Sequence, residues 1–141
     1  MEIKNRKAYF DYFIEEEVEA GIVLKGTEIK SIRKGSANLK DCYVRIKNDE
    51  AFVINMFIGK YEEGNIHNHE ERRERKLLLN KNEIRKFKVG ATQDGYNIIP
   101  LKMYINRGRA KLLIGLAKGK KLYDKREVIK QRDLKRDQKL L

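Results

Sequence analysis

DCYVRIKNDEAFVINMFI, residues 41–58, decides the fold, because it contains the clearest β-hairpin pattern in the chain. Cys42, Val44 and Ile46 alternate with polar residues, which is typical of a strand that buries one face. The pair Asn48-Asp49 follows, and such pairs favour a two-residue hairpin turn. We therefore predict two antiparallel strands here, the second running over residues 51–58.

Two further segments on either side of this hairpin have strand character. Residues 96–119 read as a second hairpin, with Pro100 inside its first strand and a tight turn at Asn106-Arg107-Gly108. A proline within a strand indicates an edge or a bulge. Residues 8–24, AYFDYFIEEEVEAGIVL, predict a strand or a bent strand pair. The acidic run within it, residues 15–17 and 19, could be a metal or acid–base cluster, but alternation favours a solvated strand edge.

Two short helices are expected between the strands. In residues 21–36, Ile22, Ile29 and Ile32 fall at helical spacing, with Thr27 as a cap and Gly35 as a stop. In residues 76–95, the capping signals are Asn80 with Glu83 three residues later, and the helix ends at Gly90. Strands without regular βαβ alternation argue for an antiparallel sheet. The expected fold class is mainly β: a small OB-like barrel of about six strands with two or three short helices.

The basic charge is spread over both the body and the end of the chain. The 141 residues carry a net charge of +12, and residues 118–141 hold ten Lys or Arg against four Asp or Glu. That final stretch lacks an apolar stripe. We therefore predict one domain, residues 1–117, and a flexible basic tail, residues 118–141, that is disordered when free and orders against a polyanion. Nucleic acid is the partner that this charge favours.

Other classes of protein fit the composition less well. No apolar run approaches the roughly 18 residues of a membrane-spanning helix, and the N-terminus lacks the apolar core of a signal peptide, so we expect a cytoplasmic protein without a membrane partner. Cys42 is the only cysteine. Its place in an alternating strand predicts a buried, structural thiol.

The segment from residue 59 to residue 76 is glycine-bearing and highly charged, which predicts a surface loop. His67, His69 and Glu70, with Glu71 nearby, are side chains that zinc or manganese would accept. The spacing matches no recognised closed site, so solvent exposure or an RNA contact is favoured over a metal site. The end of the loop is crowded with cations, and such clusters position phosphate: Arg72, Arg73, Arg75 and Lys76.

Five motifs occur in order along the chain: NRKAYFDYFIEEEVEAG, GTEIKSIRKG, RKLLL, IGLAKGKK and YDKR. With them the sequence resembles the SsrA-binding protein family, small protein B of bacterial trans-translation. The resemblance implies an OB-like barrel that binds the transfer-RNA-like domain of transfer-messenger RNA and accompanies it to stalled ribosomes. It also implies a binding protein that is not an enzyme and has no cofactor, and we expect a monomer.

The resemblance assigns roles to residues by position. It ties Asn5, Glu19, Leu78 and Lys111 to binding of that RNA. Glu28, Lys30 and Arg33 match a charged family block, in which RNA contact and internal pairing both remain open. In the tail, which in the family enters the vacant messenger channel and becomes helical there, the matching DKR motif and the cations after it are expected to contact the ribosome: Asp124, Lys125, Arg126, Lys130 and Arg132.

Two alternatives stay open from the residues alone. A structural ribosomal protein would also be basic and tailed. A metal-dependent nuclease would use His67, His69 and Glu70. An adaptor for one folded RNA remains the leading hypothesis.

Overall fold

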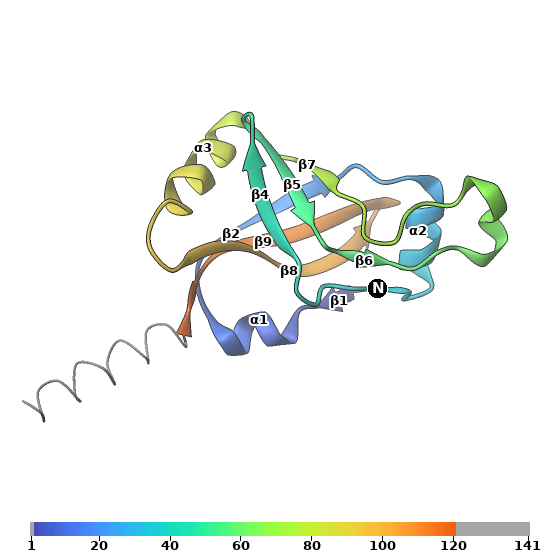
Figure 1. The fold of residues 1–141 in the computed structure, drawn as a ribbon, viewed down its shortest axis with the longest axis horizontal. Helices are drawn as coiled ribbons and strands as arrows, with labels where there is room; N and C mark the ends of the chain where they lie inside the picture. The colour runs from blue at the N-terminus through green and yellow to red at the C-terminus, as the bar shows by residue number, and fades with distance from the viewer. Residues whose placement is uncertain (1, 121–141) are drawn as a thin grey trace, which may run out of the picture.

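The computed structural model describes residues 2–120, apart from the side chains of residues 64–66 (Figure 1). Its order is β1 (Glu2–Lys4), α1 (Arg6–Asp11), β2 (Tyr12–Ile22), α2 (Gly26–Arg33), β3 (Ala37–Asn38), β4 (Tyr43–Lys47), β5 (Glu50–Ile54), β6 (Phe57–Ile58), the 3-10 helix η1 (Glu62–His67), β7 (Arg75–Leu78), α3 (Lys81–Gly90), β8 (Tyr96–Asn106) and β9 (Arg109–Gly119). The part of the tail that holds Asp124, Lys125, Arg126, Lys130 and Arg132 lies outside the described residues.

The main sheet is antiparallel and closes on itself. Its order is β1-β8-β4-β5-β7-β2-β9, and β9 also pairs with β8, so six strands form a ring and β1 adds to β8 from outside. This confirms the predicted mainly-β barrel of about six strands. One large apolar cluster fills the barrel, with Leu39, Val53, Met103 and Ile114 among its fully or almost fully buried members. A second, smaller cluster contains Leu101.

The hairpin that decides the fold is present, but it is shorter than predicted. Asn48 and Asp49 have φ of 52° and 59°, the left-handed pair that a type I′ turn requires. The second strand ends at Ile54, because Asn55 also adopts a positive φ of 63° and turns the chain away. Residues 57–58 form β6, which pairs with β3 in a separate two-stranded sheet. A single strand over residues 51–58 was therefore wrong.

The N-terminal segment begins with a helix where a strand was predicted. Residues 6–11 form α1, with Asn5 as its N-cap and Ala8 as its buried residue. Ala8 packs with Ile99, Leu101 and Ala117, so tertiary contacts override the β propensity of the aromatic residues. The strand prediction holds from Tyr12 to Ile22.

Both predicted helices form, with one change of cap. α3 has the expected capping box, in which Asn80 and Glu83 exchange hydrogen bonds with each other's backbone N–H. α2 begins at Gly26, two residues earlier than a Thr27 cap implies, with Lys25 as its N-cap, and Glu28 accepts a 2.8 Å hydrogen bond from the backbone N–H of Lys25. Ile22 belongs to β2 and not to this helix. None of the helices in residues 2–120 has the length and apolar character needed to cross a membrane.

The long C-terminal hairpin carries the predicted bulge. The pairing of β8 with β9 shifts between Pro100 and Lys102, so the proline sits where the ladder is interrupted. Arg107 and Gly108 make the turn with positive φ. β9 continues to Gly119, with Lys118 opposite both Phe13 and Tyr96. Lys118 and Gly119, which we had counted in both this hairpin and the tail, are strand residues.

Candidate nucleic-acid interface

Three of the four residues that the family resemblance ties to RNA converge on one face of the barrel wall. Directly opposed residues of antiparallel strands point to the same side. Lys111 of β9 lies opposite Gly21 of β2, and Gly21 lies opposite Leu78 of β7. Tyr104 of β8 lies opposite Lys111 on its other side. Glu19 is two residues from Gly21 and shares its side of β2. We call this surface, made by Glu19, Leu78, Tyr104 and Lys111, the outer face.

A glycine makes the apolar part of the outer face possible. A Cβ at Gly21 would lie 3.3 Å from the side chain of Leu78, so the leucine covers the space above the glycine. Leu78 is nevertheless 56% exposed, which is unusual for a leucine in a sheet. An exposed leucine flanked by polar side chains can pack on an unstacked base.

Glu19 is held in place by a residue that our sequence reasoning missed. The hydroxyl of Tyr104 donates a hydrogen bond to Oε2 of Glu19 across β9. The Tyr104 ring in turn lies 5.3 Å from Nζ of Lys102, which pairs with Glu2 at 3.3 Å. The sequence did contain a signal that could have identified Tyr104: it alternates with Met103, which is buried, in the predicted strand. Glu19 thus presents an oriented, exposed acceptor next to a cation.

Lys111 is the cation at the centre of the outer face. Its neighbours in register are Gly21 and Tyr104, neither of which carries a charge at neutral pH. No ion pair of Lys111 occurs within residues 2–120, so its charge is available to a phosphate.

Asn5, the fourth of these residues, makes side-chain contacts within the protein. Its side-chain amide donates to the Pro100 carbonyl at 2.8 Å, and its Oδ1 accepts from the Ala8 N–H at 3.3 Å. Both ends of the side chain are therefore engaged within the protein. Asn5 fixes α1 against β8, and α1 extends the outer face with exposed aromatic rings, of which Phe10 is 80% exposed.

Arg75 does not have the exposed position that a phosphate contact was expected to give it. It lies in β7, not in a surface loop, and it is fully buried. Its Nε donates to Oε2 of Glu28, and its Nη1 donates to the Met56 carbonyl at 2.6 Å. A phosphate contact requires exposure that this side chain does not have. Lys76, the next residue, is exposed on the same side of β7 as Leu78 and lies 3.7 Å from Glu50.

Glu28, whose role the sequence left open, is an internal ion-pair partner. Its carboxylate is completely buried and also accepts hydrogen bonds from Arg73. Burial by itself raises the pKa of Glu28, but the hydrogen bonds from Arg73, the Lys25 backbone and Arg75 outweigh it and hold that pKa below its ordinary value. The charged block of α2 therefore divides into a buried acid and exposed cations.

Lys30 and Arg33 are those exposed cations, and they do not join the outer face. Lys30 lies 5.4 Å from the centre of the Tyr61 ring, and Lys34 lies 4.8 Å from the same ring. They belong to the end of the molecule where α2 meets the segment around η1 (Figure 1).

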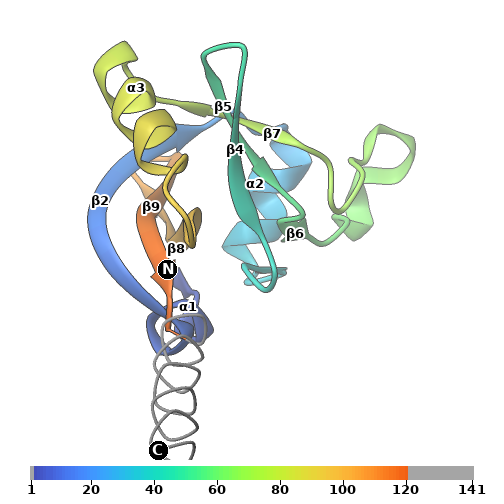
Figure 2. The same ribbon diagram turned by 60° about the vertical axis from the view of Figure 1, so that its left-hand side comes forward.

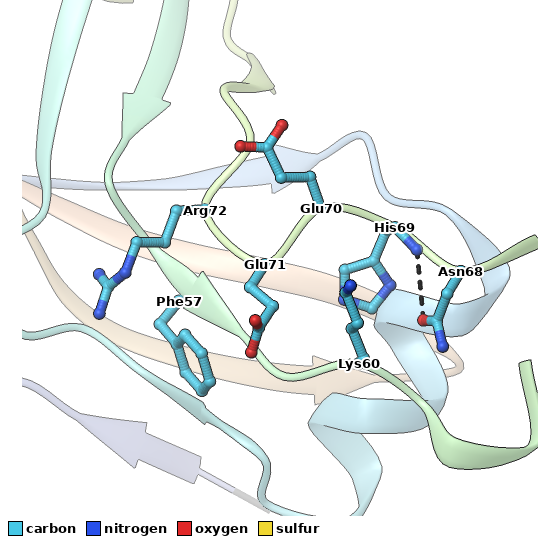
Figure 3. Close-up of a pocket in the computed structure, with 7 residues that line it drawn as sticks. All are labelled: Phe57, Lys60, Asn68, His69, Glu70, Glu71 and Arg72. Atoms are coloured by element: carbon cyan, nitrogen blue, oxygen red, sulfur yellow. Dashed lines mark hydrogen bonds between the residues drawn. The ribbon is translucent and has the colours of Figure 1, made fainter.

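The two histidines that were considered as metal ligands have different surroundings. Figure 3 shows His69 at the wall of a pocket of about 560 Å³, with Phe57, Lys60, Glu71 and Arg72 around it. Nε2 of His69 donates to the Ile58 carbonyl at 2.9 Å, and its Nδ1 lies 2.9 Å from the Thr27 hydroxyl. Both ring nitrogens are engaged, whereas His67 is exposed. Within residues 2–120 no three potential metal ligands gather into a site.

Known proteins with this sequence pattern decide the family. A family model described as SmpB protein matches residues 2–140. The chain belongs to the SmpB family. The SsrA-binding protein of Shouchella clausii (strain KSM-K16) is 62% identical over 135 residues, which cover 95% of this chain and 86% of that protein. The SsrA-binding protein of Staphylococcus aureus (strain JH1) is 57% identical over 134 residues, which cover 95% of this chain and 87% of that protein.

A solved structure agrees with the SmpB assignment. It is described as "tmRNA-SmpB: a journey to the center of the bacterial ribosome" and matches with a TM-score of 0.73 and 46% identity, covering 84% of each chain. The family resemblance noted in the sequence is thereby confirmed, and so is the barrel that it implied.

Proposed function

We propose that this SmpB-family chain is an RNA-binding adaptor of trans-translation. Its outer face binds the transfer-RNA-like domain of transfer-messenger RNA, and the protein accompanies that RNA to stalled ribosomes. One observation carries the proposal: residues from β2, β7, β8 and β9, far apart in the sequence, place a cation, an oriented acceptor and an exposed leucine side by side. The names of the relatives support the same RNA and the ribosome as partners.

The chemistry of each residue on the outer face gives it a distinct role. Lys111 neutralises a phosphate, Glu19 accepts a hydrogen bond from a sugar hydroxyl or a base amine, and Leu78 packs on an exposed base. Tyr104 keeps the Glu19 carboxylate in position. Asn5 acts through the placement of α1.

The remaining parts of the proposal concern the tail and the setting. Asp124, Lys125, Arg126, Lys130 and Arg132 contact the ribosome in the empty messenger channel, where a basic segment gains ion pairs as it orders. An adaptor of this kind binds an RNA and delivers it to the ribosome. It acts in the cytoplasm, where the ribosomes are.

The test is the salt dependence of binding to the isolated transfer-RNA-like domain. Lys111→Ala is expected to weaken binding and to lower the slope of log K against log salt by about 0.7–0.9, the value of one lost phosphate contact. Lys40→Ala, which removes an exposed cation outside the outer face, is the matched control. An unchanged slope in Lys111→Ala would show that this lysine does not touch phosphate.

A second variant tests the division between body and tail. Deleting residues 124–141 is expected to leave affinity for the isolated RNA largely intact and to abolish rescue of stalled ribosomes in a translation assay. Loss of RNA affinity on truncation would move recognition from the barrel to the tail.

A further inference from the structure

The side of the sheet that carries the outer face continues beyond Lys111 and Gly21, toward the turn between β8 and β9. Figures 1 and 2 show the β8–β9 hairpin running beside β2, and β7 pairs with β2 on its other side. Side chains two residues apart along a strand point to the same side. Arg109 lies two residues before Lys111 on β9, and Val23 lies two residues after Gly21. Both therefore point to the side of the outer face.

Val23 is an exposed apolar side chain on a fixed backbone. It is 47% exposed and directly follows β2. Its N–H donates to the Lys76 carbonyl at 2.9 Å, which continues the ladder between β2 and β7. Its carbonyl accepts from Nη2 of Arg73 at 3.5 Å, and Nε of Arg73 donates to buried Glu28 at 3.1 Å. Because its backbone has a partner on each side, the exposed side chain of Val23 has a defined place on the surface.

Arg109 is an exposed cation at the start of β9, opposite Asn106 of β8. In the part of the chain that the structure describes, residues 2–120, its guanidinium makes no ion pair. Lys76 of β7 differs in this respect, since it lies 3.7 Å from Glu50. The guanidinium of Arg109 is therefore available to an anion, and its planar fork of donors suits a phosphate.

The charge of the surroundings favours an anion at this end of the face. Residues 96–119, the β8–β9 hairpin, contain five Lys or Arg and no Asp or Glu. Glu19, the acid of the outer face, belongs to β2 and lies opposite Leu113, four residues along β9 from Arg109. An anionic chain that reaches the β8–β9 turn therefore meets Arg109 and Lys111 at a distance from that carboxylate.

The spacing of these side chains repeats from one row of the sheet to the next. Lys111 and Arg109 are two residues apart on one strand, about 6.8 Å, which is similar to the step between successive phosphates of an extended nucleic-acid strand. Leu78 lies in the row of Lys111, and continuing the register by two positions places Val23 in the row of Arg109. Each row thus offers one cation for a phosphate and one exposed apolar side chain for the face of a base.

We propose that Arg109 and Val23 form a second nucleotide subsite of the outer face, next to the subsite of Lys111 and Leu78. Arg109 binds the phosphate of the adjacent nucleotide, and Val23 packs on its base. The inference deepens the proposed function and rests on it, because it takes the same RNA as partner. A peptide cannot add here as a strand, since β9 and β2 are each paired on both sides.

The first experiment measures binding of the full-length protein to the isolated transfer-RNA-like domain over a range of salt concentrations. Arg109→Gln is expected to lower the slope of log K against log salt by about 0.7–0.9, the value of one phosphate contact. Arg109→Lys keeps the charge and is expected to keep the slope. Arg85→Gln, which removes an exposed arginine of α3, is the matched control and should leave the slope unchanged.

The second experiment tests the base contact in the same assay. Val23→Thr replaces one methyl group with a hydroxyl on an exposed side chain that stays β-branched. It is expected to weaken binding about three- to fivefold, the effect of losing one buried methyl group, without changing the salt slope. Val89→Thr, at a position of α3 that is 61% exposed, is the matched control and should bind as the original protein does.

Equal slopes for Arg109→Gln and Arg85→Gln, with thermal unfolding showing both proteins folded, would refute the second phosphate contact. Weaker binding of Arg109→Gln at an unchanged slope would also refute it, because the guanidinium would then act on a base. Equal affinities of Val23→Thr and Val89→Thr would refute the base contact. A lowered slope in Lys111→Ala leaves the proposed function standing in each of these cases, whereas an unchanged slope in that variant overturns the phosphate contact of the outer face itself.

Discussion

Replacing Glu28 with glutamine tests the buried ion pair that joins α2 to β7. The Glu28 carboxylate is completely buried, accepts from Lys25 at 2.8 Å and from Nε of Arg73 at 3.1 Å, and pairs with the equally buried guanidinium of Arg75. Glu28→Gln keeps the shape but removes the negative charge, so Arg75 is left as an uncompensated buried cation. Breaking a buried pair in this way costs about 3–5 kcal/mol.

That cost is large against the total stability of a domain, roughly 5–15 kcal/mol. At about 4 °C per kcal/mol for a folded unit of this size, the midpoint of thermal unfolding should fall by about 12–20 °C. Urea unfolding at pH 7 measures the free energy directly. Glu62→Gln, which removes an exposed carboxylate, is the control and should stay within about 0.5 kcal/mol of the original protein.

The pH dependence gives a second readout of the same interaction. The pKa of folded Glu28 is lowered, so its contribution to stability is fully present above the ordinary value of about 4.3 and is lost as the pH falls through the folded pKa. The difference in unfolding free energy between the original protein and Glu28→Gln should therefore shrink in strongly acidic solution. A Glu28→Gln protein that unfolds within 1 kcal/mol of the original at pH 7 would refute the buried-pair reasoning. Recovery of stability in Glu28→Leu with Arg75→Met would support it.

Three further variants or labels test other parts of the structure. Tyr104→Phe removes the hydrogen bond to Glu19, worth about 0.5–1.5 kcal/mol, and should weaken binding to the transfer-RNA-like domain roughly two- to tenfold in a filter-binding assay; unchanged affinity would show that the bond does not orient Glu19 for RNA. Burial raises the pKa of Cys42 to about 12, so a thiol reagent at pH 8 should modify it only after urea unfolding, and rapid labelling of the folded protein would contradict its burial. Gly115→Ala places a methyl group 2.9 Å from Ile14 and Leu101 and should destabilise the protein by about 1–3 kcal/mol in urea unfolding, whereas Gly26→Ala, which meets nothing within 4 Å, should not.

The parts of the fold that could be predicted from sequence are those set by neighbouring residues. The turn at Asn48-Asp49, the capping box of Asn80 with Glu83, and the bulge at Pro100 each depend on backbone preferences within a few positions. α1 could not be predicted in this way, because its six residues carry strand-favouring aromatics. It is helical because Ala8 fits against Ile99 and Leu101, about 90 residues away.

The charged residues of the candidate site were also hard to predict, because their positions depend on residues far away in the sequence. Arg75 sits in a run of cations that is typical of a surface loop, yet it is buried because Glu28, 47 residues earlier, lies opposite it. A period-two signal was present, since Arg75 and Leu77 are buried while Lys76 and Leu78 are exposed, but a charged residue in a buried strand position is rare without a partner. Tyr104 was missed for a related reason: its importance depends on a contact with Glu19, which only the register of β2, β9 and β8 creates.

The charge balance of the outer face explains why an acid, Glu19, can lie on it. An unrestrained carboxylate beside a phosphate backbone would repel it, which argues against Glu19 as a general RNA contact. In the proposed function, Tyr104 fixes Oε2 of Glu19 and Lys111, on the neighbouring strand, binds the phosphate. The repulsion would then act on RNAs that present a phosphate where Glu19 needs a hydrogen-bond donor. On this proposal, Glu19 adds selectivity and lowers the affinity for RNA in general, while Lys111 supplies an attraction that acts on any RNA. A basic protein that must choose one folded RNA in a cell full of others needs both terms.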